Sequence, residues 1–189
     1  MQRLTENTIE DIVNRSVNHK NMNNSNDLNI NNKYKVLFVC LGNICRSSAA
    51  DGIMHRLVEE RGVAKEWEID SAGTYGGHAG DLPDPRMRAA GSRRGYNFTH
   101  RSRKVRAEDF ERFDLLLAMD DSVYESLSRL SPSVEGLQKL ERMADYIPTR
   151  FGYDYVPDPY YEGAEGFELV LDMLEEGCRE LYERVVSNE

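Results

Sequence analysis

An eight-residue stretch of the chain combines residue types that could bind a phosphate group and attack it. It begins with Cys40, ends with Arg46 and Ser47, and reads CLGNICRS. A cysteine thiolate is a strong nucleophile. An arginine guanidinium can donate two parallel hydrogen bonds to two oxygens of one phosphate. The stretch is therefore a candidate site for phosphate chemistry.

The elements predicted on either side would place these groups at one cavity. Residues 35–40 (KVLFVC) are an apolar, β-rich run that predicts a buried strand, and residues 47–61 carry apolar side chains at helical spacing. A loop that wraps onto a helix N-terminus points backbone N–H groups inward, where the helix dipole also favours an anion. Gly42 and Asn43 tolerate the positive φ that a tight loop requires.

These features predict an anion-binding loop in which Cys40 is a thiolate and Ser47 donates a hydrogen bond to its sulfur. The phosphate would be held by the Arg46 side chain and by the backbone of the loop. The predicted phosphate-binding residues are Leu41, Gly42, Asn43, Ile44, Cys45 and Arg46.

A purely structural interpretation of the same residues is open. A cysteine that ends a buried strand is usually an inert small hydrophobe, and Arg46 could pair with a nearby acid. The surrounding strand, Gly-Asn pair and helix favour the phosphate site. A metal site on Cys40 and Cys45 is not expected, because Cys178 lies on a distant predicted helix and the histidines are scattered. We also expect no organic cofactor.

Further along the chain, strands and helices are predicted to alternate. Alternation of this kind indicates an α/β fold: a single open, mostly parallel twisted sheet flanked by helices, with the phosphate-binding loop after the first strand. Residues 134–147 are ambiguous between a strand near Leu140 and another helix. The other predicted strands are residues 67–71 and 115–119, and the other predicted helices are residues 86–95, 107–113, 121–130 and 166–186.

Composition limits the other classes of function. The net charge of −9 argues against nucleic-acid binding. No apolar run is long enough to span a bilayer, so we expect a cytoplasmic location without membrane insertion. Three cysteines are too few for a disulfide scaffold. Residues 18–32 are dominated by asparagine, so residues 1–32 are predicted to be a flexible extension of a domain over residues 33–189.

The sequence VCLGNICRS resembles the phosphate-binding loop of the low-molecular-weight protein tyrosine phosphatase family. A second string, Asp158-Pro159-Tyr160-Tyr161, resembles the general-acid loop of that family. Two weaker matches, residues 70–74 and 114–120, fall between them in the order and spacing of the family. The resemblance covers about residues 34 to 186.

The resemblance implies a role for each matching residue. Cys40 would be the nucleophile, Arg46 the phosphate clamp, and Asp158 the general acid and then the base. Cys45 would form a reversible disulfide with Cys40. Asn43 would hold the shape of the loop, and the residues that support it would be Ser47, Ser71 and His100. The pocket wall would include Tyr160, Tyr161 and Tyr75.

Some of these residues also have ordinary explanations. Asp-Pro is a common start of a turn, and without Cys40 a turn would be the preferred interpretation of Asp158. Either Tyr75 or His78 must replace the large aromatic residue that relatives place in this loop. Arginines between residues 86 and 106 are usually a solvated face, and a docking surface for acidic phosphoproteins is the less favoured interpretation.

The implied activity is hydrolysis of phosphotyrosine in tyrosine-phosphorylated proteins, with a cognate tyrosine kinase as a further partner. An arsenate reductase on the same fold is one alternative, but it would need relay cysteines, and none occurs between Arg46 and Asp158. A phosphoprotein-binding module without turnover is the other. The complete set of Cys40, Arg46 and Asp158 argues against such a module.

Overall fold

The computed structural model describes residues 33–187. The flexible extension predicted over residues 1–32 lies outside the described residues. Among the described helices, none combines the length and the apolar character that crossing a membrane requires.

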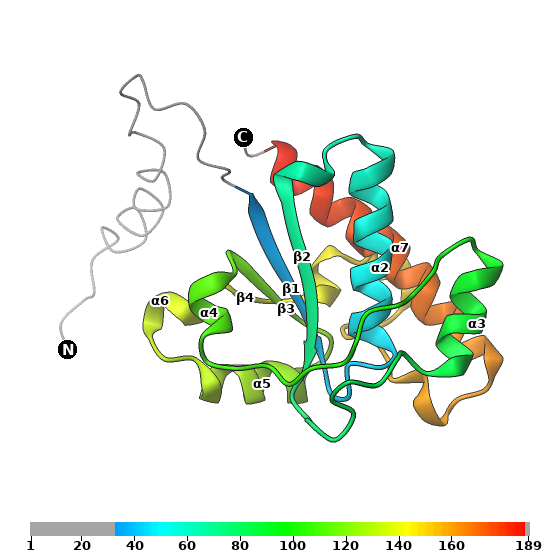
Figure 1. The fold of residues 1–189 in the computed structure, drawn as a ribbon, viewed down its shortest axis with the longest axis horizontal. Coiled ribbons are helices and arrows are strands. Elements are labelled where there is room, and N and C mark those ends of the chain that lie inside the picture. Colours follow the sequence, from blue (N-terminus) through cyan, green and yellow to red (C-terminus); the bar gives the residue numbers. More distant parts are fainter. Residues whose placement is uncertain (1–32, 188–189) are drawn as a thin grey trace, which may run out of the picture. The chain divides into compact units, whose positions relative to one another are not determined.

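Four parallel strands form one open sheet in the order β2-β1-β3-β4 (Figure 1). The predicted α/β class, with a single parallel sheet flanked by helices, is therefore confirmed. The strands are β1 (Tyr34–Cys40), β2 (Trp67–Gly73), β3 (Leu115–Ala118) and β4 (Leu140–Arg142).

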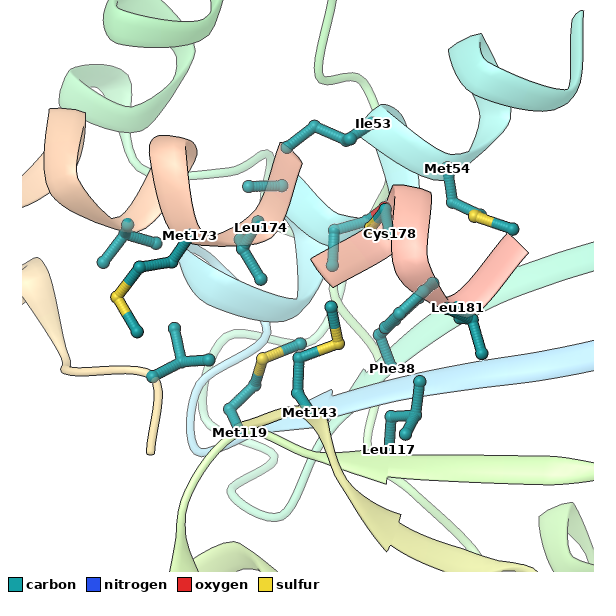
Figure 2. Packing of buried hydrophobic residues seen from close by; sticks show 14 of the residues in the cluster. Phe38, Ile53, Met54, Leu117, Met119, Met143, Met173, Leu174, Cys178 and Leu181 are labelled. Carbon is teal, nitrogen blue, oxygen red and sulfur yellow. The ribbon is translucent and has the colours of Figure 1, made fainter. Parts of the chain in front are cut away.

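Side chains of β1 point alternately to the two faces of the sheet, and different helices cover each face. Val36 and Phe38 point into one hydrophobic cluster with side chains of α2 (Arg46–Glu60) and α7 (Ala164–Ser187). Figure 2 shows this cluster, in which Phe38 and Leu117 of the sheet face Cys178 and Leu181 of α7. Leu37 and Val39 point into a second cluster, against the helices of the other face.

Shorter helices complete the described chain. The α3 helix begins with Pro85 in its first turn, and the Asp84 side chain caps it, as expected for a sharply defined helix start. The remaining helices are α3 (Pro85–Arg93), α4 (Asp109–Arg112), α5 (Asp121–Leu130) and α6 (Val134–Leu137). The 3-10 turns are η2 (Ala64–Glu66), η3 (Met143–Tyr146), η4 (Thr149–Phe151) and η5 (Pro159–Tyr161).

The structure resolves one ambiguous prediction and corrects the end of one strand. The ambiguous residues 134–147 contain both alternatives, the α6 helix and the β4 strand, each too short to produce a clear periodicity. The β2 strand continues two residues beyond the predicted end, to Gly73, which pairs with Cys40 of β1. It can do so because Gly73 has no side chain: a Cβ there would lie 2.7 Å from the carbonyl oxygen of Leu41.

The strand order places the candidate residues at one edge of the sheet. After β1, the chain adds β2 on one side of β1 and then β3 on the other, so a switch point lies between β1 and β3. In open α/β sheets, ligands bind beyond the carboxyl ends of the strands at such a point. Cys40 ends β1 and Asp120 closely follows β3, so both lie at this edge.

Candidate active site

The loop between β1 and α2 turns tightly around the sulfur of Cys40. Asn43 adopts a left-handed backbone conformation with φ of 56°, and in this conformation its backbone N–H donates to Cys40 Sγ at 3.2 Å. Asparagine is one of the few residues with a side chain that adopts this conformation readily. The loop then enters α2, whose first residue is Arg46.

The side chain of Asn43 fastens the loop to its surroundings. Its amide nitrogen donates to Ser47 Oγ at 2.9 Å and to Ser71 Oγ at 3.0 Å. Its carbonyl oxygen accepts from the backbone N–H of Arg103 at 2.9 Å. Asn43 is buried, with 1% of its surface exposed, so these hydrogen bonds satisfy polar atoms that water cannot reach.

The Cys40 sulfur sits where donors and a helix terminus converge. Its side chain is buried, and Ser47 Oγ lies 3.0 Å from the sulfur, in addition to the N–H of Asn43. The sulfur also lies close to the beginning of α2, where the helix dipole is positive. An N–H donor and the positive end of a helix dipole both attract negative charge to this position, as in an anion-binding loop.

Arg46 is held rigidly although it is a long side chain. Its Nη1 donates to Asp120 and to the carbonyl oxygen of Val156, and its Nη2 donates to Asp158 Oδ2 at 2.8 Å. Burial lowers the pKa of Arg46, but the negative charges of Cys40, Asp158 and Asp120 outweigh burial and raise this pKa overall. Arg46 is therefore a permanent cation whose orientation is fixed.

Asp158 faces this cation from a loop more than a hundred residues further along the chain. Pro159 and the short η5 turn follow it, and Asp158 Oδ1 accepts from the backbone N–H of Tyr160 at 3.1 Å. The side chain is 41% exposed, so it remains accessible to a bound molecule and to water. An accessible carboxyl beside a fixed cation can exchange protons with a ligand in the same pocket.

The phosphate-binding loop and the Asp158 loop enclose one cavity of about 230 Å³. This is smaller than the roughly 300–1,000 Å³ of sites for drug-sized ligands, so it suits a single small group. Tyr75 and His78 both contribute to its wall, with Tyr161 almost fully exposed at its rim. The lining residues are Cys40, Leu41, Gly42, Ile44, Cys45, Arg46, Tyr75, His78, Asp158, Tyr160 and Tyr161.

The other two cysteines lie in different surroundings. Cys45 lines the cavity but is buried, and burial raises the pKa of its thiol, with the Asp84 carboxylate adding to the shift. Cys178 is fully buried on α7, and burial raises its pKa as well. All three cysteines are free thiols. Cys45 and Cys178 therefore stay protonated, which makes them poor nucleophiles.

His100 lies beside two carboxylates rather than beside Asn43. Its Nδ1 lies 3.7 Å from carboxylate oxygens of both Asp51 and Asp70, and its described polar contacts do not include Asn43. Burial raises the pKa of Asp51 to about 6, with the charge of Asp70 adding to the shift, while His100 and a hydrogen bond to Ser71 act in the opposite direction. The connection from His100 to Asn43 therefore passes through Asp51 and Ser71.

Asp51, Asp70 and His100 form a cluster whose geometry could hold a metal ion. Among the described residues, their ligand atoms lie within 4.8 Å of one another. The group lies outside the phosphate cavity. Arg103 already donates to Asp70 Oδ2 at 3.0 Å, and this supplies positive charge to the cluster. We interpret the cluster as support for the loop.

Two site residues could not be assigned a role from the sequence. Asp120 follows a predicted buried strand and caps α5 by accepting a hydrogen bond from the backbone N–H of Val123. Its contact with Arg46 had no signal in the sequence. Arg103 was one of several arginines and gave no signal. It binds Asp70 and Asp109 and donates its backbone N–H to Asn43.

A buried thiol, a fixed guanidinium and an accessible carboxyl thus share a cavity at the switch point of a parallel sheet. Fold and site together define a cysteine-dependent phosphatase.

Comparison with known proteins identifies the family. Residues 35–189 match the family model for low molecular weight phosphotyrosine protein phosphatase. The chain is 42% identical to a low molecular weight protein-tyrosine-phosphatase of Streptomyces coelicolor over 75% of this chain and 87% of that relative. It is 37% identical to the human low molecular weight phosphotyrosine protein phosphatase over 79% and 94% of the two chains.

A solved structure of a protein tyrosine phosphatase has the same fold as this chain. The crystal structure of a protein tyrosine phosphatase from Entamoeba histolytica matches with a TM-score of 0.79 and 40% identity, covering 82% of this chain and 99% of that one. The chain belongs to the low molecular weight phosphotyrosine protein phosphatase family, and it is an enzyme of that class.

Proposed function

We propose that this enzyme hydrolyses phosphotyrosine in two steps through a phosphocysteine at Cys40. The observation that carries the proposal is the environment of the sulfur, which accepts from the backbone N–H of Asn43 at 3.2 Å and lies 3.0 Å from Ser47 Oγ. Such an environment stabilises a thiolate at the bottom of an anion-binding loop.

In the first step, the Cys40 sulfur attacks phosphorus. A sulfur–phosphorus bond forms while the bond from phosphorus to the tyrosine oxygen breaks. Asp158 transfers its proton to this phenol oxygen as it leaves. Arg46 and the backbone N–H groups of the loop match the charge on the equatorial phosphate oxygens.

In the second step, water attacks the phosphocysteine. A new phosphorus–oxygen bond forms, the sulfur–phosphorus bond breaks, and the Cys40 thiolate returns. Asp158, now ionised, accepts the proton that the water loses. Inorganic phosphate then leaves the loop. The same residues therefore serve both steps, and the two steps need no oxidant and no reactant other than phosphotyrosine and water.

The pocket wall suits an aromatic substrate. Tyr160 and Tyr75 are partly exposed around the cavity, and Tyr75 and His78 pack edge to face with ring centroids 6.0 Å apart. Aromatic rings in such arrangements bind another ring well. We infer that Tyr75 and His78 together replace the single large aromatic side chain expected in this loop, with Tyr160 and Tyr161 on the other side.

Supporting roles follow from the hydrogen bonds. Asn43 holds the loop, Ser47 and Ser71 hold Asn43, and His100 acts through Asp51.

Cys45 traps oxidised Cys40 as a disulfide. The partners would be tyrosine-phosphorylated proteins and a cognate tyrosine kinase, in the cytoplasm.

Neither alternative activity gains support from the described residues. An arsenate reductase would need a further accessible thiol to continue the relay, whereas Cys178 is fully buried in the core. A silent binding module would have no use for an accessible carboxyl beside the phosphate clamp.

The leaving-group dependence of an Asp158→Asn variant tests the mechanism. Phenyl phosphate has a basic leaving oxygen, like tyrosine, whereas p-nitrophenolate leaves readily without a proton. General acids contribute ~10²–10⁴-fold, so kcat/KM should fall far more for phenyl phosphate than for p-nitrophenyl phosphate. Equal losses for both substrates would exclude Asp158 as the acid. Turnover of p-nitrophenyl phosphate that survives Cys40→Ser would exclude the nucleophile.

A further inference from the structure

Arg86 connects the two loops that meet at the cavity without lining the cavity itself. It lies in the first turn of α3, and its side chain is about half exposed. Within the described part of the chain, the residues that line the cavity do not include Arg86. Arg86 therefore does not form part of the cavity wall, and its contacts connect it to the site through the groups that it holds.

On one side, Arg86 is bound to the phosphate-binding loop through Asp84. Its Nε and Nη2 donate to the two carboxylate oxygens of Asp84 at 3.0 and 2.7 Å, a paired geometry that fixes the plane of the guanidinium. The backbone N–H of Asp84 donates to the carbonyl oxygen of Ile44 at 2.8 Å. The Asp84 side chain is 7% exposed and the Arg86 side chain is about half exposed, so water reaches the pair mainly from the side of the arginine.

On the other side, Arg86 is bound to the Asp158 loop. Its Nη1 donates to the carbonyl oxygen of Tyr160 at 2.9 Å. The guanidinium carbon also lies 5.2 Å from the centre of the Tyr160 ring and 4.9 Å from that of Phe167 on α7. Such distances give favourable cation–π contacts, so both the backbone and the ring of Tyr160 are held.

The position of Tyr160 in turn determines that of Asp158. The backbone N–H of Tyr160 donates to Asp158 Oδ1 at 3.1 Å, and only Pro159, whose φ is fixed by its ring, separates the two residues. The chain of contacts therefore runs from Ile44 through Asp84, Arg86 and Tyr160 to the carboxyl of Asp158.

We propose that Arg86 is a positioning residue that sets the general acid Asp158 at its working distance from the phosphate-binding loop. This inference rests on the proposed function, in which Asp158 protonates the leaving oxygen. Without Arg86, the carbonyl of Tyr160 loses its donor, and the link of the Asp158 loop to the loop of Cys40 through Asp84 is lost, while the contacts of Arg46 with Asp158 and Val156 remain. The carboxyl then samples positions from which it cannot reach the leaving oxygen.

Arg93 provides a matched control. It lies on the same helix, is also exposed, and donates to Glu168 of α7 at 2.6 Å. Arg93→Met therefore removes a positive charge and a contact between α3 and α7, as Arg86→Met does. It leaves the Asp158 loop untouched.

The experiment measures kcat/KM for phenyl phosphate and p-nitrophenyl phosphate in five proteins. They are the wild type, Arg86→Met, Arg93→Met, Asp158→Asn and the double variant of Arg86→Met with Asp158→Asn. Misplacement of a catalytic group by about 1 Å can cost ~10²-fold, so we expect Arg86→Met to lower the phenyl phosphate value at least ~10-fold more than the p-nitrophenyl phosphate value. Arg93→Met should leave the ratio of the two values unchanged.

The double variant separates positioning from a structural role. If Arg86 acts through Asp158, its removal from the Asp158→Asn protein should not change the ratio further. An Arg86→Met protein that slows both substrates equally would overturn the inference. The inference would also be overturned if the double variant had a lower ratio of the phenyl phosphate value to the p-nitrophenyl phosphate value than Asp158→Asn alone.

Failure of this inference is distinguishable from failure of the proposed function. If Asp158→Asn itself shows no leaving-group dependence, both are overturned, whereas dependence in Asp158→Asn alone overturns only the role of Arg86. Thermal unfolding followed by circular dichroism checks that each variant folds. If Arg86→Met does not, Arg86→Lys carries the same test, because a lysine keeps the charge but cannot bridge Asp84 and Tyr160 with a planar fork.

Discussion

Arg46 and Asp158 form an ion pair across the mouth of the phosphate-binding loop, with Nη2 2.8 Å from Oδ2. The residue proposed as the phosphate clamp is therefore paired with the residue proposed as the general acid. A phosphate that enters must compete with the Asp158 carboxylate for Arg46. The charge of Asp158 also opposes the charge of the incoming anion.

Removal of this charge should tighten phosphate binding while it slows the reaction. We expect Asp158→Asn to bind inorganic phosphate about 10-fold more tightly at neutral pH, because a like charge near the anion is removed. Isothermal titration calorimetry measures this affinity. Asp154→Asn, an exposed change in the same segment, is the control and should have little effect. Weaker phosphate binding by Asp158→Asn would contradict the competition.

The difference between the thiols predicts how oxidation proceeds. The Cys40 sulfur accepts a hydrogen bond from the backbone N–H of Asn43, whereas burial raises the pKa of Cys45, so peroxide should oxidise Cys40 first. The neighbouring Cys45 thiol should then trap the sulfenic acid as a disulfide. We expect thiol reductant to restore most activity in the wild type and much less in Cys45→Ser. Equal recovery of the two proteins would mean that Cys45 is only a packing residue.

Asn43 should be important for stability as well as for the loop. Asn43→Ala removes three side-chain hydrogen bonds and places alanine at a φ of 56°, which costs free energy. At about 1 kcal/mol for each net hydrogen bond, plus the cost of the strained backbone, the free energy of unfolding should fall by roughly 3–5 kcal/mol. Urea denaturation measures the loss.

A glycine at the same position separates the two contributions. Asn43→Gly removes the same hydrogen bonds but adopts positive φ without strain, so it should be less destabilising than Asn43→Ala. If the alanine variant is the more stable of the two, backbone conformation is not part of the role of Asn43.

The buried Asp51 predicts a change of stability with pH. Burial raises its pKa to about 6, above the value of roughly 3.9 for an exposed aspartate, so between these values the folded state binds more protons than the unfolded state. Asp51 therefore makes its most favourable contribution below pH ~4, and this contribution is lost as pH rises through about 6.

An Asp51→Asn variant isolates this effect from those of other carboxyls. The difference in free energy of unfolding between wild type and variant should shift in favour of the variant as pH rises from about 4 to about 6, and should then level off. Urea denaturation at several pH values follows the difference. A constant difference across this range would mean that Asp51 titrates as an exposed carboxyl does.

The elements that position the site could largely be predicted from the sequence, because each has a strong local signal. The apolar run before Cys40 and the helical spacing after Arg46 both depend on neighbouring residues. The three-residue β4 strand carries no such signal. Its pairing with β3 depends on residues far away in the sequence.

The partners of charged side chains could not be predicted for the same reason. Asp120 and Arg46 are 74 residues apart, and nothing in the local pattern of either indicates the other. Several arginines that were expected on a solvated face are instead bound to acids, such as Arg94 to Glu168 and Asp172 of α7. The position of Arg86 between two loops likewise appears only in three dimensions.

Identification of the phosphorylated residue tests the central claim most directly. Turnover of p-nitrophenyl phosphate is stopped rapidly with acid, and the digested protein is analysed by mass spectrometry. The mechanism predicts a phosphate on the peptide that contains Cys40, at the cysteine itself, in the wild type and in Cys45→Ser, and no phosphopeptide in Cys40→Ser. A phosphate trapped on any other residue, or undiminished turnover by Cys40→Ser, would contradict it.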